Sequence, residues 1–203
     1  GAGVAAGPFH SQSNEAWFTH VPGLKVIYPS TASDAKGLLL TAFEDPNPVL
    51  FFEHKALYRS TTEEVPNAYF TIPFGKARLM HEGKKLSIIT YGMGVHWAMD
   101  YVQETGLHAD VVDLRSLQPI DWETVFASVN KCGRALVLHE DSLFGGIGGE
   151  IVARIMAACF EHLDAPVMRL ASLDTPVPFA KPLEDNYLPK DRLHATIEKL
   201  LAY

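Results

Sequence analysis

Residues 24–53 read LKVIYPSTASDAKGLLLTAFEDPNPVLFFE, and this stretch decides the fold class. The apolar runs at 24–28 and 49–53 are each bounded by proline, which is typical of buried strands. Between them, Thr31 and Asp34 stand three positions apart, a pattern that begins helices. The stretch therefore predicts a β-α-β unit with parallel neighbouring strands. Its helix carries apolar side chains at helical spacing, at Ala35, Leu38, Leu39, Ala42 and Phe43.

The β-α-β unit needs further structure around it. Two strands and one helix cannot bury their own apolar surface in water. We expect residues 1–57 to be the last part of a domain whose earlier strands lie in an upstream segment or in another polypeptide. The alternative is that these strands extend the sheet formed by the following residues into one larger domain.

The rest of the chain predicts a linker and a second module. Residues 58–74 lack periodicity and are rich in Thr, Glu and Pro, which is typical of a linker. In residues 75–203, two apolar runs flank HEGK at 81–84 and predict a hairpin of strands 76–80 and 86–91 that adds one antiparallel edge strand. Strands then alternate with helices, which predicts a three-layer α/β/α domain with a mostly parallel sheet. The expected strands are 111–114, 135–138 and 167–170, and the expected helical stripes are Val95-Ala98-Met99-Val102, Trp122-Val125-Phe126-Val129, Ile151-Val152-Ile155 and, from Asp191 onward, Leu193-Ile197-Leu200-Leu201.

Composition excludes several function classes. The chain has 203 residues, a formal net charge of −7 and 47% hydrophobic residues, which is ordinary for a folded α/β protein. An acidic surface argues against nucleic acid or an anionic membrane as the main partner. No run approaches the roughly 18 apolar residues of a membrane span. The two cysteines, Cys132 and Cys159, lack a metal-binding spacing, which favours reduced thiols in a cytosol-like compartment.

A histidine in a glycine-rich approach is the first candidate site. The segment GAGVAAGPFHSQS at residues 1–13 places His10 behind three glycines and before Ser11 and Gln12. Glycine lets a backbone approach another group closely, and histidine moves protons near neutral pH. The segment has no hydrophobic periodicity, which favours a loop, and a plain connection is the alternative to a catalytic role.

Two further polar clusters follow strands of the second module. The glycines at 145–149 precede a helix, but they lack the lysine of a phosphate loop, which favours a tight turn with Glu150 complementing the helix dipole. His139-Glu140-Asp141 follows a strand, where open α/β sheets place ligands. A functional and a structural role stay open for this triplet.

The first module carries a possible cation site and two unassigned histidines. Asp45 and Asn47 offer oxygen atoms in a proline-punctuated loop, which suits a hard cation, although a plain turn is the alternative. His20 and His54 have no identifiable partner in the sequence, so we expect both at a surface or a boundary.

Taken together, these segments resemble a known family. The chain is similar to the β subunit of the thiamine-diphosphate-dependent decarboxylase component of 2-oxo acid dehydrogenase complexes. HSQS at 10–13 and FFE at 51–53 point to the branched-chain (2-oxoisovalerate) type more than to the pyruvate type. The other matching segments are PGLKV at 22–26, DAKGLL at 34–39, NP at 47–48, LYR at 57–59, DLR at 113–115, Pro119, GG at 145–146, AP at 165–166 and DTP at 174–176.

The resemblance implies a fold and a cofactor. Residues 1–57 would be the last part of a transketolase-like pyrimidine-binding domain, and residues 75–203 a transketolase C-terminal-like domain. The glutamate that activates the cofactor would lie upstream of Gly1. Thiamine diphosphate and its Mg²⁺ would be held mainly by an α subunit or a fused α-like half. We therefore expect the chain alone to be inactive.

The resemblance also implies roles for particular residues. His10 would be the catalytic histidine, acting on the acyl group as it passes to the lipoyl sulfur, and Ser11 and Gln12 would line the site. A structural K⁺ would be bound by the Ala42 carbonyl, Asp45 and Asn47. The remaining expected contacts are with the lipoyl acyltransferase core and lie at Asp164 and at the carboxylate of Tyr203.

The implied assembly also contains a second β copy in an α2β2-type arrangement, with a 2-oxo acid as substrate. The compartment would be the bacterial cytoplasm or the mitochondrial matrix. A transketolase-like or deoxyxylulose-phosphate-synthase-like fragment is an alternative, but Arg59, Arg78 and Arg115 are too scattered to indicate a sugar-phosphate site. A non-catalytic subunit-assembly module is the other alternative.

Overall fold

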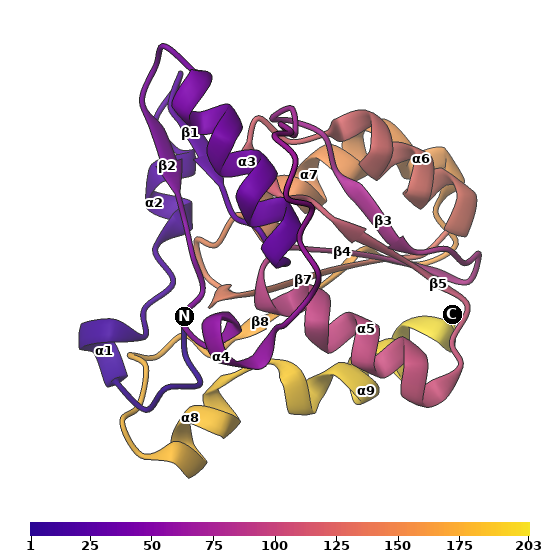
Figure 1. Cartoon of the computed structure of the whole chain (residues 1–203). Helices are drawn as coiled ribbons and strands as arrows, with labels where there is room; N and C mark the ends of the chain where they lie inside the picture. Colours follow the sequence, from indigo (N-terminus) through magenta and orange to yellow (C-terminus); the bar gives the residue numbers. More distant parts are fainter.

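A computed structural model describes all residues, 1–203. The chain forms two sheets with helices packed around them (Figure 1). The helices are α1 Gly7–His10, α2 Glu15–Thr19, α3 Ala32–Glu44, α4 Leu57–Ser60, α5 Met93–Thr105, α6 Trp122–Cys132, α7 Gly148–Cys159, α8 Lys181–Tyr187 and α9 Leu193–Leu201. The strands are β1 Lys25–Ile27, β2 Val49–Phe51, β3 Arg78–His81, β4 Leu86–Thr90, β5 Ala109–Asp113, β6 Ser116–Gln118, β7 Ala135–Ser142 and β8 Met168–Ser172.

The five-stranded sheet has the order β3-β5-β4-β7-β8, and every pair of neighbouring strands is parallel except β3 and β5. Helices α5 and α9 cover one face, and α6 and α7 cover the other (Figure 1). Successive residues of β4 alternate between the two layers: Ile88 packs with the α5 and α9 side, and Ile89 packs with the α6 and α7 side. The predicted three-layer α/β/α domain is confirmed.

The three-stranded sheet has the order β2-β1-β6. Strands β1 and β2 pair in parallel around α3, so the predicted β-α-β unit is confirmed, and the Thr31 side chain accepts from the backbone N–H of Asp34 as expected. Strand β6 pairs antiparallel to β1 and comes from the C-terminal module. The first module therefore neither closes by itself nor joins the larger sheet, because it completes a small sheet with a strand borrowed from residues 116–118.

The predicted hairpin of strands 76–80 and 86–91 is wrong. Strand β3 is the antiparallel edge strand, but its partner is β5, which lies between β3 and β4. The connecting residues explain the insertion, because the backbone N–H groups of Lys84 and Lys85 both donate to His108 O and that of Gly83 donates to Asp110 Oδ1. These bonds hold the connection against the start of β5, so the chain crosses over β5 before β4 begins.

Helix α3 buries a different face from the predicted one. Leu38 is buried, but Leu39 is 40% exposed and Phe43 is 81% exposed. The buried side carries Asp34 and Gly37 instead. A Cβ at Gly37 would meet the side chains of residues 70 and 72, so a segment of the predicted linker packs directly on this face. Burial of Asp34 follows from an ion pair with Arg115, at 3.0 Å, which draws the helix toward the second module.

The remaining helical stripes are confirmed in their central positions, at Val95, Ala98, Val125, Val129 and Ile151, with Ile155, Leu193, Ile197 and Leu200 also buried. Helix α4 falls at the start of the predicted linker, and α8 was not expected. None of the helices combines the length and the apolar character that crossing a bilayer requires.

Candidate functional site

The segment that carries His10 folds over the end of the C-terminal module. It forms one turn, α1, and a second short helix, α2, rather than the expected loop without helix. The turn closes because Ser11 N donates to Gly7 O, at 3.1 Å. The ring of Phe9 packs on Phe179, with centroids 5.8 Å apart, which sets α1 beside the segment that precedes α8 (Figure 1).

His10 is exposed at the end of α1 and lines a cavity of about 430 Å³. Gln12 and Glu15 line the same cavity, together with Tyr28 and Lys55. The ammonium of Lys55 donates to the carbonyl oxygen of His10, at 3.1 Å, which holds the backbone while the imidazole remains unpaired. Lys55 is the one cationic side chain of this lining.

The two neighbours of His10 differ in surroundings. The Gln12 amide donates to Pro8 O at 2.6 Å, across the turn, and Gln12 is exposed. Ser11 is buried, and its hydroxyl has no hydrogen-bond partner. Neither side chain hydrogen-bonds to the His10 imidazole, and their roles in lining the site remain predictions.

Glu140 gathers three groups beneath this segment. Its Oε1 accepts from Ala2 N at 2.6 Å and from the Ser13 hydroxyl at 3.2 Å, and its Oε2 lies 2.6 Å from His54 Nε2. Burial opposes ionisation of Glu140, but the His54 hydrogen bond and charge and the Ala2 N–H together keep its pKa below the usual value. His54 was expected at a surface or a boundary, and it lies at the boundary between the two modules: it is 2% exposed and pairs with Glu140 from the end of β7.

A second buried carboxyl, Glu15, lies nearby at the start of α2. Tyr91, directly after β4, donates its hydroxyl to Glu15 Oε1 at 2.7 Å, while Oε2 is buried without a partner. Burial and the charge of Asp141 raise the pKa of Glu15 to about 7. Burial, together with the Glu140 charge, likewise raises the pKa of Asp141 to about 6. Of these two carboxyls with raised pKa values, Glu15 lines the His10 cavity and Asp141 lines a neighbouring one. The sequence analysis did not single out Glu15.

His139, the first residue of the triplet, is buried beneath the glycine turn. It is fully buried, neither ring nitrogen has a hydrogen-bond partner, and its ring stacks on Tyr91 at a centroid distance of 6.4 Å. Burial and the charge of Arg169 lower its pKa to about 4, so the ring is neutral near pH 7. A Cβ at Gly146 or Gly148 would strike this ring.

The glycine turn at 145–149 packs closely on His139. Gly145 adopts a φ of +73°, which favours glycine, and Glu150 stands in the first turn of α7 as predicted. Within the triplet His139-Glu140-Asp141, the first residue packs and the second anchors the His10 segment.

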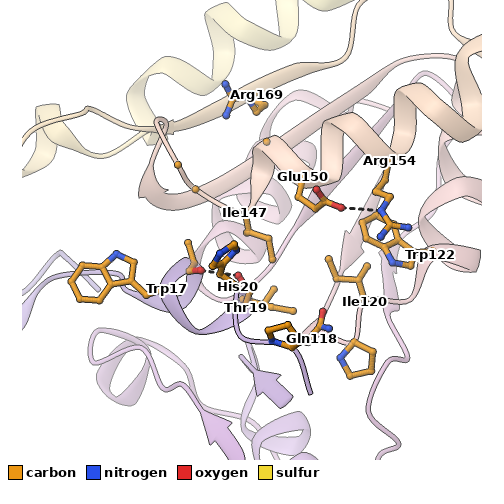
Figure 2. A pocket seen from close by; sticks show the side chains of 17 residues that line it. Trp17, Thr19, His20, Gln118, Ile120, Trp122, Ile147, Glu150, Arg154 and Arg169 are labelled. Carbon is orange, nitrogen blue, oxygen red and sulfur yellow. Dashed lines mark hydrogen bonds and ion pairs between the residues drawn. The ribbon is translucent and has the colours of Figure 1, made fainter. Parts of the chain in front are cut away.

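The largest cavity, about 940 Å³, lies between α2 and the start of α7 (Figure 2). Trp17 and His20 line one side, and Glu150 and Arg154 line the other. The Arg154 guanidinium donates to Glu150 at 2.9 Å and lies 5.4 Å from the centre of the Trp122 ring. These charges are satisfied within α7 and against Trp122, so the cavity offers an aromatic rim rather than a charged cluster. His20 is exposed there, as expected.

The expected cation site has its carboxylate already engaged. Lys25 donates to Asp45 Oδ2, and Asn47 donates to Oδ1 from its backbone and its side chain at 2.9 and 3.2 Å. The Lys25 and Asn47 hydrogen bonds hold the pKa of Asp45 below its usual value. The chain contains no group of three or more His, Cys, Asp or Glu side chains placed to hold a metal ion. Coordination of a structural K⁺ by Ala42, Asp45 and Asn47 stays a prediction.

The two expected docking residues lie on the surface. The Asp164 side chain is 63% exposed and has an arginine partner, Arg134, at 3.4 Å. Tyr203 is also exposed. Their proposed contacts remain untested predictions.

Comparison with known proteins identifies two domain families. The C-terminal domain of transketolase matches residues 75–192, and the pyrimidine-binding domain of transketolase matches residues 1–61. Among solved structures, a split-gene transketolase in an inactive β4 tetramer superimposes with a TM-score of 0.72 at 25% identity, covering 93% of this chain and 61% of that one.

Curated relatives match the whole chain. The β subunit of mitochondrial 2-oxoisovalerate dehydrogenase from Dictyostelium discoideum is 44% identical over 100% of this chain and 56% of its own length. Two Bacillus subtilis relatives are the β subunit of 2-oxoisovalerate dehydrogenase, at 42% identity, and the β subunit of the pyruvate dehydrogenase E1 component, at 45%. The chain spans 64% and 63% of the lengths of these two. The resemblance read from the sequence is thereby confirmed.

Proposed function

The chain belongs to the transketolase family, and from that premise we propose that it is the β-subunit portion of a thiamine-diphosphate-dependent 2-oxo acid dehydrogenase. The complete enzyme would decarboxylate a 2-oxo acid oxidatively and transfer the acyl group to lipoamide. The observation that carries this proposal is similarity across the whole chain to β subunits of that class, at 42–45% identity. A branched-chain acid is the favoured substrate, and pyruvate is the competing one.

His10 is the catalytic residue of the proposal. Its imidazole is exposed to a cavity and its carbonyl oxygen is held by Lys55, and histidine is the side chain best suited to proton transfer near neutral pH. Bound thiamine diphosphate supplies the carbon nucleophile that makes decarboxylation feasible. His10 would donate a proton to the lipoyl sulfur as the acyl group is transferred, and Gln12 and Ser11 would line its surroundings.

The lining of the His10 cavity fits only part of the cofactor. A diphosphate with Mg²⁺ needs several cations or oxygen ligands, and here Lys55 is alone and no carboxylate cluster is available. We therefore assign the diphosphate and Mg²⁺ to an α subunit or a fused α-like half. A structural K⁺ at Ala42, Asp45 and Asn47 requires that Lys25 first leave the Asp45 carboxylate.

Further partners follow from the same proposal. A second β copy and the lipoyl acyltransferase core would complete the assembly, with Asp164 and the Tyr203 carboxylate facing a basic surface of the core. The compartment would be the bacterial cytoplasm or the mitochondrial matrix. Relatives named as mitochondrial and relatives from bacteria both match the chain, so the compartment depends on the source.

The test is turnover by the full-length protein with its α partner, thiamine diphosphate and Mg²⁺. We expect 3-methyl-2-oxobutanoate to be oxidised faster than pyruvate with a dye acceptor, and neither to react without the cofactor. His10→Ala should lower acyl transfer to lipoamide by about 10²–10⁴-fold while sparing more of the dye-coupled reaction. Unchanged lipoamide turnover in His10→Ala would remove His10 from the mechanism.

A transketolase-like function is the second candidate, favoured by the similarity to a split-gene transketolase. Ketol transfer between sugar phosphates, or a deoxyxylulose-phosphate-synthase-like condensation, would replace 2-oxo acid oxidation. Turnover of sugar phosphates, with no oxidation of either 2-oxo acid, would favour it. Stable assembly with the α partner and no turnover of any substrate would favour a non-catalytic assembly module instead.

A further inference from the structure

We propose that Glu140 and Glu184 are positioning residues: two buried carboxylates of the C-terminal module that fasten residues 2–13 and so fix the direction of His10. This inference rests on the proposed function of His10. Residues 2–13, which we call the loop although they include the single turn α1, belong to the first module in sequence. Both carboxylates come from the second module, Glu140 from β7 and Glu184 from α8.

Glu140 binds both ends of the loop at once. It accepts from Ala2 N at 2.6 Å before His10 and from the Ser13 hydroxyl at 3.2 Å after it. Its other oxygen is held by His54, 2.6 Å away, which orients the carboxylate toward the loop. A single rigid strand end therefore sets the separation between the two ends of the segment.

Glu184 binds the middle of the approach to His10. Its two oxygens accept from Ala5 N at 3.2 and 3.1 Å, and it is 1% exposed. Ala5 has a φ of +52°, between Gly3 at +89° and Gly7 at +54°. An alanine seldom adopts this conformation without support, and the bonds to Glu184 supply it.

The burial of Glu140 and Glu184 makes their hydrogen bonds to the loop energetically important. A buried carboxylate is strongly unfavourable unless hydrogen bonds compensate the loss of water. The only hydrogen bonds to the Glu184 carboxylate come from Ala5, and two of the three to Glu140 come from the loop. If the loop moved away, Glu184 would be left buried without a partner and Glu140 would keep only His54, so the conformation of the loop is strongly specified.

The consequence for the reaction is geometric. His10 stands eight residues after Ala2 and three before Ser13, so its backbone lies inside the fastened segment. A displacement of about 1 Å in a catalytic group can lower a rate by about 10²-fold. The two carboxylates would thus act through the loop without touching the substrate.

The experiment uses the full-length protein with its α partner and compares Glu140→Gln, Glu184→Gln and Ser13→Ala with Asp185→Asn. Asp185 neighbours Glu184 on α8 but pairs only with Lys181 at the surface, so it is the matched control. The first readout is amide hydrogen exchange over residues 2–13, which is independent of activity. The second is acyl transfer to lipoamide, measured beside the dye-coupled rate and the KM for the 2-oxo acid.

We expect exchange over residues 2–13 to rise in the three loop-contact variants. Acyl transfer should fall by about 10–100-fold, with the KM for the 2-oxo acid unchanged. Ser13→Thr should restore the rate lost in Ser13→Ala, because it returns the hydroxyl. Asp185→Asn should change neither readout.

Unchanged exchange in Glu140→Gln and Glu184→Gln would overturn the proposal whatever the activity. The proposal would also be overturned if these variants exchanged faster over residues 2–13 but transferred the acyl group at the wild-type rate, provided that His10→Ala abolishes transfer. If His10→Ala has no effect, the proposed function of His10 fails, and the exchange readout alone decides whether the carboxylates fasten the loop. Should Glu140→Gln not fold, Ser13→Ala removes one bond at a partly buried side chain and provides the same comparison.

Discussion

The two sheets of this chain are stabilised in different ways. In the five-stranded sheet, all residues of β4 and β5 are buried, and all the strands come from one continuous stretch of chain, residues 78–172. In the three-stranded sheet, β2 is an edge strand with every residue only half-buried, and β6 comes from the other module. The small sheet therefore depends on contacts from the large module, and its Val26 shares the core between the large sheet and helices α6 and α7.

Buried polar groups join the two regions at several points, in addition to the pairing of β6 with β1. Arg115 bridges to Asp34 at 3.0 Å, Ser30 donates to the buried Asp113 carboxyl, and Tyr91 donates to Glu15. Each joins a polar group of the first region to one of the second in a buried setting. Such groups are strongly destabilising when one partner is lost, so the comparison between regions can be tested by removing them.

The largest expected effect is that of Arg115→Ala. Its guanidinium is 11% exposed and pairs with Asp34, which is 3% exposed, so the variant leaves a buried carboxylate without its main partner. We expect a loss of about 3–5 kcal/mol in the free energy of unfolding. Arg78→Ala is the matched control, since Arg78 approaches the same carboxylate at 3.6 Å from a 49% exposed position, and it should lose about 1 kcal/mol or less.

Urea unfolding of the full-length protein at fixed concentration measures both variants. Equal small losses would mean that the two regions are held together by apolar contacts instead, and that Asp34 is readily hydrated when Arg115 is absent.

A pair of apolar truncations compares the two sheets directly. Ile89 of β4 is fully buried against α6 and α7, and Leu50 of β2 is half-buried at a sheet edge. Ile89→Ala should lower the free energy of unfolding by about 2–5 kcal/mol, and Leu50→Ala by about 1 kcal/mol. Both are measured by urea unfolding. A loss at Leu50 as large as that at Ile89 would indicate that β2 is covered by another surface in the native protein.

The difference between the regions also explains what the sequence could predict. The β-α-β unit and the helices α5, α6, α7 and α9 follow from local periodicity, and their central apolar residues are buried as expected. Strand β6 has three residues and no periodicity, and its partner β1 lies some ninety positions earlier in the sequence. The wrong hairpin has the same cause, because insertion of β5 between β3 and β4 depends on backbone bonds to His108 that no side-chain pattern encodes.

The candidate site was predictable to a lesser extent. His10 was found because glycine and hydroxyl neighbours surround it, and it does line a cavity. No partner for His54 could be identified in the sequence, because Glu140 lies 86 residues away. Glu15 looks like an ordinary helix-start residue, and only the fold places it beneath Tyr91. Long-range pairing of buried polar groups is thus the part of the site that sequence patterns leave out.

Glu15 gives the contact between the regions a pH dependence. Its pKa is raised from 4.5 to about 7, so the folded state binds a proton more tightly than the unfolded state does. The stabilisation from this proton is fully present below pH 4.5 and is lost as the pH rises through about 7. Relative to Glu15→Gln, wild-type stability should fall by about 3 kcal/mol across that window.

Urea unfolding of the wild-type protein and of Glu15→Gln at several pH values between 4.5 and about 7 gives the free energy of unfolding of each as a function of pH. Parallel curves would mean that Glu15 titrates normally in the fold, and that water reaches it beneath Tyr91.

The smallest expected effect concerns the helix caps of the two regions. Thr31 caps α3 through one bond to Asp34 N, at 3.2 Å, so Thr31→Ala should lower the free energy of unfolding by about 1 kcal/mol. Asp121 caps α6 and also accepts from Ala77 N at 3.0 Å, so Asp121→Ala should lose about 2 kcal/mol. Thermal unfolding at one protein concentration compares them. Because α3 is held chiefly through Asp34 by the other module, a loss well above 1 kcal/mol in Thr31→Ala would show that the cap, and not Arg115, fixes this helix.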